Sequence, residues 1–236
     1  MEESTFSTNE PDLFSILDRL IFRLRHRRDG GAGGRPDRRL HNQAGAPATS
    51  PDGTTTIEQY ARIDADGDYM WQFWARHQDK LTLLEPEQPD YAAGFRFTND
   101  SQWLVRMQKT GAGYASLYLY HLGPQGFVTA TRKPLSDLAW AYFKSLPDSR
   151  KIRRPNFHIE ADLVKGVDDN YRWMGETWPD SRYLVISLSG EVSPTGRGQL
   201  QSLRGWRCRY DLQKGAFDVP PSFAENNAKA IARDSE

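Results

Sequence analysis

A short motif occurs twice in this chain of 236 residues, each time followed by a second matching block. Residues 99–106 read NDSQWLVR and residues 179–186 read PDSRYLVI, so the pattern Asp-Ser-x-aromatic-Leu-Val recurs at an offset of 80. Farther along, YHL at 120–122 and YDL at 210–212 repeat at an offset of 90. Because the two matches keep their order, they indicate two copies of one supersecondary unit.

Each copy carries the signals of an antiparallel meander, over about 95–131 and 171–219. The Asp-Ser pair is typical of a turn, because its side-chain oxygens can accept a hydrogen bond from a backbone amide two residues on. The runs that follow are rich in aromatic and β-branched residues and are separated by glycine, which indicates strands. The expected strands are 94–98, 103–107, 117–122 and 127–131 in the first copy, and 171–174, 183–187, 206–212 and 217–219 in the second.

This arrangement resembles the blades of the TolB-like and WD-type β-propeller families. The resemblance is carried by Pro179-Asp180-Ser181 before Leu184, and by Leu-Tyr-Leu-Tyr at 117–120. A propeller needs roughly four to eight blades, whereas this chain has two copies and one further hairpin, at 69–76 and 80–84. We therefore predict a mainly β (β-rich α+β) fold, with two meanders packed as a sandwich or as one curved sheet and not as a full propeller.

Two or three peripheral helices are expected around this sheet. One covers 136–146, between the copies, and another starts at a capping box, Ser222 to Glu225, and runs to about residue 232. In the strand at 206–210 apolar and basic residues alternate, so Trp206, Cys208 and Tyr210 face the core. Cys208 then acts as a small buried apolar residue.

The chain before residue 57 differs in composition from the rest. Residues 1–28 form an amphipathic tail with apolar residues at helical spacing and arginines opposite, and 29–56 read as a disordered linker of Gly, Ala, Pro, Arg and Asp. A single β-rich domain is expected over 57–236. The segment 11–28 has four interpretations: peripheral membrane contact, docking on a partner, packing on the main domain, or a tail without a function of its own. It does not read as a signal peptide, so the default compartment is cytoplasmic, and a misassigned start leaves export open.

Charge and cysteine content exclude several classes of protein. Lys and Arg together number 31 and balance 31 acidic residues, which argues against a globally basic nucleic-acid binder. The single cysteine rules out a disulfide framework within one chain. The sequence has no apolar run long enough to predict a transmembrane segment.

One acidic turn resembles a calcium loop without matching its spacing. Asp64, Asp66 and Asp68 lie on a short segment, but Gly67 is at the fourth position and Ala75 at the twelfth, where an EF-hand has Gly at the sixth and Glu at the twelfth. We expect a solvated turn, with these three carboxylates as the candidate ligands of a divalent cation. No other cofactor is predicted.

The candidate binding residues combine acids with aromatics. Asp168 and Asp169 precede Tyr171, Trp173 and Trp178, a composition suited to contact with a sugar or a peptide. A second acid pair is Glu160 with Asp162, and the long loop at 190–205 is present in only one copy.

No serine-hydrolase elbow, phosphate loop or dinucleotide fingerprint is present in the sequence. We therefore expect a non-catalytic binding module that recognises a protein or a small ligand through its aromatic-rich β surface and loops. Two alternatives stay open: a hydrolase or divalent-metal-dependent enzyme that uses the Asp64 turn or the Asp168–Asp169 pair, and an exported, envelope-associated protein.

Overall fold

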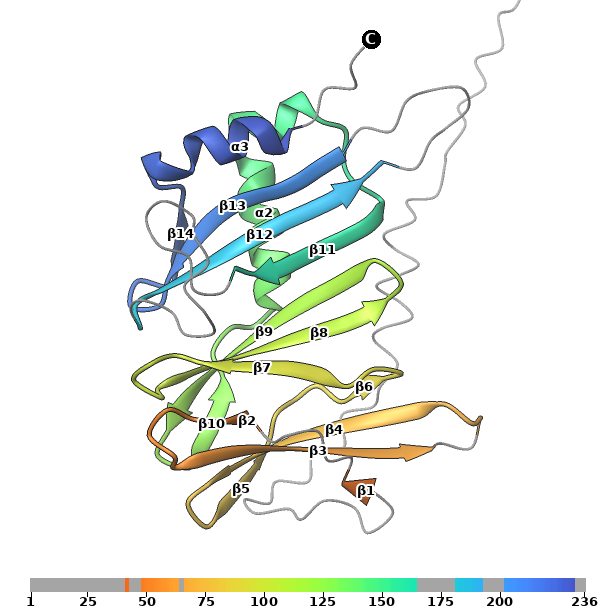
Figure 1. Ribbon diagram of the computed structural model, residues 1–236, viewed down its shortest axis with the longest axis vertical. Coiled ribbons are helices and arrows are strands. Elements are labelled where there is room, and N and C mark those ends of the chain that lie inside the picture. Colours follow the sequence, from red (N-terminus) through yellow and green to blue (C-terminus); the bar gives the residue numbers. More distant parts are fainter. Residues whose placement is uncertain (1–40, 43–47, 64–65, 165–180, 193–201, 232–236) are drawn as a thin grey trace, which may run out of the picture. The chain divides into compact units, whose positions relative to one another are not determined.

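The computed structural model describes residues 41–42, 48–63, 66–164, 181–192 and 202–231. All of them lie in the compact unit that begins at Gly33. The described part of this unit is mainly β and contains two sheets and two α-helices (Figure 1). The described strands close into neither a barrel nor a propeller, as the sequence predicts.

The first sheet is centred on a long hairpin. Strands β3 (Thr55–Ile63) and β4 (Tyr69–His77) pair in unbroken antiparallel register from Thr55↔His77 to Ile63↔Tyr69. Short strands cover both sides of this hairpin: β1 (His41–Asn42) and β2 (Ala48–Thr49) pair with β3, and β5 (Lys80–Leu83) and β6 (Gln88–Pro89) pair with β4. Paired β-structure therefore begins upstream of residue 57, within the segment expected to be a linker.

The second sheet has eight strands in the order β14-β13-β12-β11-β9-β8-β7, with β10 also paired to β9. Every pairing is antiparallel except β9 with β11, which is parallel. Its strands are β7 (Ala93–Phe97), β8 (Trp103–Gly111), β9 (Tyr114–Gly123), β10 (Gly126–Thr129), β11 (Phe157–Leu163), β12 (Tyr183–Glu191), β13 (Ser202–Asp211) and β14 (Ala216–Asp218). Each strand and hairpin expected from the sequence on described residues is present, and the expected strand at 171–174 lies outside them.

The two copies of the repeat fold into hairpins of the same register. Leu104 pairs with Tyr120 in β8–β9, and the matching Leu184 pairs with Tyr210 in β12–β13. The two meanders belong to one continuous sheet, in which β11 is inserted between them. Their turns also touch, because the Asp100 amide donates a hydrogen bond to Ser181 Oγ at 2.9 Å.

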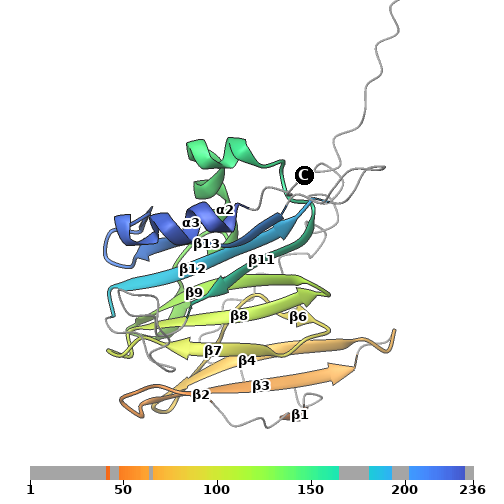
Figure 2. The same cartoon turned by 45° about the horizontal axis from the view of Figure 1, so that its top comes forward.

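Two apolar cores lie on different parts of the large sheet. One is formed with helix α2 (Leu135–Ser145), whose Phe143 meets Trp206 of β13 with ring centroids 4.8 Å apart. Trp206, Cys208 and Tyr210 are all buried there, as the alternation predicts. The other core packs the first sheet on β7–β10, where Phe73 meets Phe95 at 5.7 Å. The result is a sandwich at one end of the large sheet and a helix-covered layer at the other (Figure 2).

The second core also contains a buried arginine. Arg106 of β8 is fully enclosed, and its guanidinium carbon lies 4.6 Å from the Phe73 ring centroid and 4.2 Å from that of Tyr118. Its Nη1 donates to the carbonyls of Leu84 and Pro86, at 3.1 and 2.9 Å. Burial lowers the pKa of Arg106. The side chain thus connects the turn after β5 to β8, the strand next to the β7 edge of the large sheet.

The C-terminal helix does not begin with the expected capping box. The chain turns through a 3₁₀ segment, Pro221–Phe223, before helix α3 (Ala224–Ala230) begins, and no side chain caps the helix. The prediction was wrong because Ser222 lies inside the 3₁₀ turn, so its hydroxyl is not at the first free amides of the α-helix. No helix in the described part of the chain is long and apolar enough to cross a membrane.

Candidate functional site

The aromatic loop named from the sequence lies outside the described residues. Its members are Asp168, Asp169, Tyr171, Trp173 and Trp178. The described residues on either side of it are held close together, because the Val164 amide donates to the Val185 carbonyl at 2.9 Å. On the returning side, Arg182 pairs with Asp211 at 2.9 Å. The loop therefore leaves and rejoins the sheet at the beginning of β12.

The acidic turn joins β3 and β4. Asp64 lies outside the described residues, while Asp66 and Asp68 are exposed at the tip of the hairpin. Ile63 and Tyr69 pair across this tip, with 61% and 47% of their surface exposed. Among described residues, no group of three or more His, Cys, Asp or Glu is arranged to hold a metal ion. The three-aspartate cation site stays a prediction, since one of its members is not described.

The structure brings the second acid pair together in a small hollow between β11 and the β8–β9 turn. Glu160 and Asp162 lie two residues apart on β11 and both line this hollow of about 310 Å³. Partial burial, with the charge of Glu160 added, raises the pKa of Asp162. Neither carboxylate has an ion-pair partner among described residues. We call this the acidic hollow; its other lining residues are Met107, Lys109, Gly111, Gly113, Tyr114 and Ala115.

A second hollow of about 260 Å³ adjoins the first and shares Gly113 and Glu160 with it. Apart from His158 of β11, its remaining lining comes from the end of β12 and the start of β13, on either side of the long loop, so we call it the loop-base hollow. His158 Nδ1 lies 3.4 Å from a Glu191 carboxylate oxygen. The remaining lining residues are Ser189, Gly190, Leu203 and Arg204.

One glycine controls how closely the β8–β9 turn approaches this hollow. Gly113 has a φ of +70°, and a Cβ at this position would overlap the ring of His158. His158 itself has a φ of 46°, next to a register shift between β11 and β12. The imidazole therefore lies against bare backbone, in a place that only glycine leaves open.

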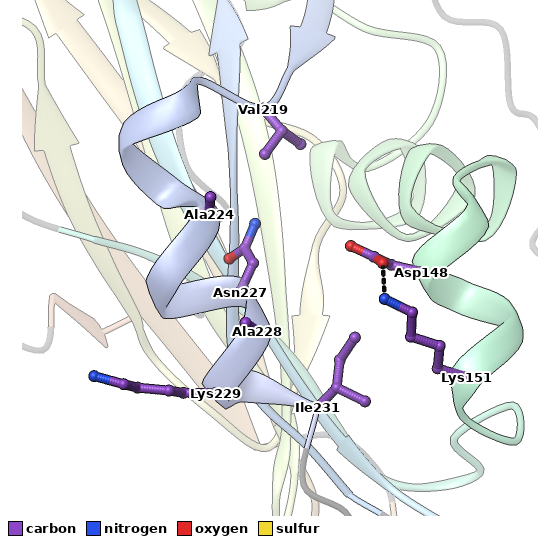
Figure 3. A pocket seen from close by; sticks show the side chains of 8 residues that line it. All are labelled: Asp148, Lys151, Val219, Ala224, Asn227, Ala228, Lys229 and Ile231. Carbon is purple, nitrogen blue, oxygen red and sulfur yellow. Dashed lines mark hydrogen bonds and ion pairs between the residues drawn. The ribbon is translucent and has the colours of Figure 1, made fainter.

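A third depression lies between α3 and the 3₁₀ helix η1 (Pro147–Lys151), with a volume of about 750 Å³. Figure 3 shows apolar side chains of the α3 segment on one side and the Asp148–Lys151 ion pair, at 2.6 Å, on the other. The second lysine on its rim, Lys229, pairs with Glu225 at 2.6 Å. Both lysines are thus neutralised within the chain, and the groove presents mainly small apolar surface from Val219, Ala224, Ala228 and Ile231.

Sequence reasoning named the Glu160–Asp162 pair and the 190–205 loop separately, but not their proximity. It missed Gly113, His158 and Arg204 as members of one site. Glycine next to a turn is common, and Gly126 also has a positive φ and a Cβ position that would overlap a side chain, that of Thr82, so no sequence signal singles out Gly113.

Comparisons with known proteins add no relative. No protein-family model matches the chain, and no curated protein matches it.

Proposed function

We propose that this protein is a non-catalytic binding module, which recognises a protein or a small ligand at the adjoining acidic and loop-base hollows. One observation carries the proposal. The base of the long loop that distinguishes the second copy lies beside two other segments: the β8–β9 turn at Gly113, and β11, which contributes the polar side chains of His158 and Glu160. Loops positioned by a rigid sheet are the usual place for recognition residues.

The two hollows present both negatively and positively charged side chains to a ligand. Glu160, Asp162 and Glu191 supply carboxylates, while Lys109 and Arg204 supply cations. Each hollow alone is at or below the lower end of the roughly 300–1,000 Å³ typical of small-ligand pockets. We therefore expect the ligand to span both, across the shared Gly113 and Glu160.

The aromatic loop at 165–180 is the second recognition element in this proposal. It joins β12 at Tyr183, whereas the long loop leaves β12 near Glu191, at the opposite end of the strand. We also propose that the two meanders are copies of a blade-like unit, since matched hairpin registers accompany the sequence repeat. Such blades present loops at both ends of their strands.

The test compares variants at the two ends of β12. Immobilised protein is used to capture partners, and a thermal-shift panel of oligosaccharides, amines and short peptides screens small ligands. The proposal predicts that Glu160→Gln with Arg204→Ala abolishes the response, and that Trp173→Ala with Trp178→Ala weakens it. Glu225→Gln, an exposed carboxylate on α3, is the matched control. A response that survives both pairs of substitutions contradicts the proposal.

A divalent-metal-dependent enzyme or hydrolase is the alternative proposal. It is favoured by the position of Glu160 and Asp162, which lie two residues apart on β11 and line one hollow, because two neighbouring carboxyl groups can divide the roles of general acid and general base. Native mass spectrometry before and after a chelator tests the metal at the Asp64 turn. A mass excess that disappears with chelator and with Asp66→Asn supports this alternative over the binding module.

A further inference from the structure

The segment 132–154 is strongly basic in a chain whose net charge is zero. It contains helix α2, the 3₁₀ helix η1 and the residues that lead toward β11. Its two acids, Asp137 and Asp148, stand against seven basic residues, all of them exposed: Arg132, Lys133, Lys144 and the four Arg and Lys of 150–154. We call these seven side chains the basic surface. None of them lines the acidic hollow or the loop-base hollow, so this surface is separate from both.

The charges of the basic surface act on one another across its elements. Partial burial raises the pKa of Asp137, and the charges of Lys133 and Lys144 oppose that effect. Partial burial also lowers the pKa of Lys144, and the charge of Arg154 adds to the shift. Like charges repel, so the fold holds Lys144 and Arg154 together at a cost in free energy. An anionic partner that lies over both relieves that repulsion.

The backbone on either side of these cations is fixed by the large sheet. Five of the eleven residues of α2 are buried against it. After the last cation, Pro155 is buried, and a Cβ at Gly190 of β12 would come within 2.8 Å of its side chain. The next amide, that of Asn156, donates to the Glu191 carbonyl at 3.0 Å. The basic surface is therefore preformed, and little ordering of the chain opposes binding.

Acids next to the basic surface leave most of its charge uncompensated. Asp148 pairs with Lys151 at 2.6 Å, as Figure 3 shows. Glu225, across the groove from η1, pairs with Lys229 of its own helix at 2.6 Å. Within 132–154 the surplus is five positive charges. Screening limits charge effects to about 8 Å at physiological salt, so a partner at this surface meets the local surplus and not the zero net charge.

An exposed aromatic ring borders the basic surface. Phe157 is 39% exposed, and it follows Arg154 by three residues, which limits their separation to about 11 Å. His158 lies against the Phe157 ring, with centroids 3.7 Å apart. That contact takes up ring surface on which a nucleic-acid base would stack. The exposed remainder suits the interfacial layer of a bilayer, where aromatic side chains are enriched.

We propose that the basic surface, together with Phe157, is a peripheral docking site for an anionic lipid bilayer. Such binding depends on two contributions, the attraction of cations to anionic headgroups and the burial of apolar surface at the interface. Exposed cations beside an exposed ring provide both. Each Lys or Arg held near an anionic membrane raises partitioning by about five-fold. This role goes beyond the recognition proposed at the two hollows and does not depend on it.

The experiment measures co-sedimentation of the full-length chain with lipid vesicles. Vesicles of phosphatidylcholine with about 30% phosphatidylserine are compared with vesicles of phosphatidylcholine alone, in about 0.1 M NaCl. Binding is expected only to the vesicles that contain phosphatidylserine, and it is expected to disappear in about 0.5 M NaCl, because the attraction is screened. A chain that binds neither kind of vesicle, or both equally, overturns the proposal.

Two double variants of equal charge test whether binding uses this surface. Lys144→Gln with Arg154→Gln is expected to lower the partition coefficient at least about ten-fold. Lys80→Gln with Lys214→Gln is the matched control, because it removes two exposed lysines, one on β5 of the first sheet and one in the β13–β14 turn. This control is expected to stay within about two-fold of the wild type. An equal loss in both variants contradicts the proposal, and so does binding that the first variant leaves unchanged.

Arg150→Gln with Arg153→Gln keeps the proposal testable if the first variant fails to fold, which circular dichroism detects. The same loss of binding is expected, since both side chains are exposed members of the surface. Binding that this folded variant retains in full rules the site out.

Two further measurements separate a bilayer from other partners. Phe157→Ala is expected to lower partitioning about three- to five-fold, whereas Ile63→Ala, an exposed apolar residue at the β3–β4 tip, is not. Equal binding of these two variants refutes the part assigned to the ring. A short DNA duplex is then added as a competitor, at an equal concentration of anionic groups. Vesicle binding is expected to persist, and a duplex that displaces the chain assigns the surface to nucleic acid and overturns the proposal.

Discussion

Gly113→Ala is expected to destabilise the protein by two separable effects. The first is the backbone, because a non-glycine residue at a φ of +70° costs about 1–2 kcal/mol. The lower conformational entropy of alanine in the unfolded chain offsets roughly 0.4–1 kcal/mol of this. The second is the overlap of the new Cβ with the His158 ring, and forcing a packed side chain to move costs about 1–3 kcal/mol. Together they lower the free energy of unfolding by about 1.5–4.5 kcal/mol.

Gly53→Ala isolates the backbone effect. Gly53 has a φ of +73°, and a Cβ there would meet no atom within 4 Å. Gly53→Ala is therefore expected to lower the free energy of unfolding by only about 0.5–1.5 kcal/mol, which is the backbone cost less the gain from the lower entropy of the unfolded chain. The difference between the two alanine variants then measures the collision with His158.

Urea unfolding followed by tryptophan fluorescence provides the free energies for a double-mutant cycle. Gly113→Ala combined with His158→Ala is expected to recover about 1–2 kcal/mol relative to the sum of the single changes, because the collision partner is gone. If Gly113→Ala costs no more than Gly53→Ala, or if the cycle shows no coupling, the close approach of Gly113 to His158 is refuted.

Two further predictions follow from burial and hydrogen bonding. Hydrogen bonds, the largest effect from the Ser50 hydroxyl and the next from the Thr54 amide, lower the pKa of Asp52 from 3.8 to about 2. The ionised Asp52 carboxylate therefore stabilises the folded state fully above about pH 4, and this stabilisation is lost as the pH falls through about 2. The urea midpoint is expected to fall over this range more in the wild type than in Asp52→Asn. Burial, with a smaller effect of Asp218, raises the pKa of Cys208 to about 12. A thiol reagent at about pH 8 is therefore expected to modify Cys208 only after unfolding, and rapid labelling of the folded protein contradicts its burial.

Local sequence patterns predicted most of the strands. In β13 the alternation of apolar and basic residues placed Trp206, Cys208 and Tyr210 in the core, since successive side chains of a strand point to opposite faces. The Leu104–Tyr120 and Leu184–Tyr210 pairs followed the repeat, because similar turns and apolar patterns fix similar registers. The effect of a single residue was harder to predict from the sequence. The Ser222-to-Glu225 pattern is typical of a helix cap, but Pro221 begins a 3₁₀ turn there and the cap does not form.

The sequence missed β11, and with it the assembly of the candidate site. The segment FHIEADL has only a weak alternation, and its strand state depends on neighbours on both sides, β9 and β12. The pair Glu160 and Asp162 was visible in the sequence, but the approach of Gly113 and Arg204 to Glu160 was not.

The order of amino acids is enough to predict a mainly β chain, a duplicated meander and the inward face of the best-patterned strands. These properties depend on neighbours a few residues apart, where periodicity and turn chemistry act. The joining of both meanders into one sheet through β11, the meeting of two hollows at Gly113, and the hydrogen bonds of Asn227 to Arg207 and of Gln59 to Ala93 emerge only in the folded chain. Each of these depends on a donor, an acceptor or a small side chain meeting a segment far away in sequence, and packing alone sets those distances.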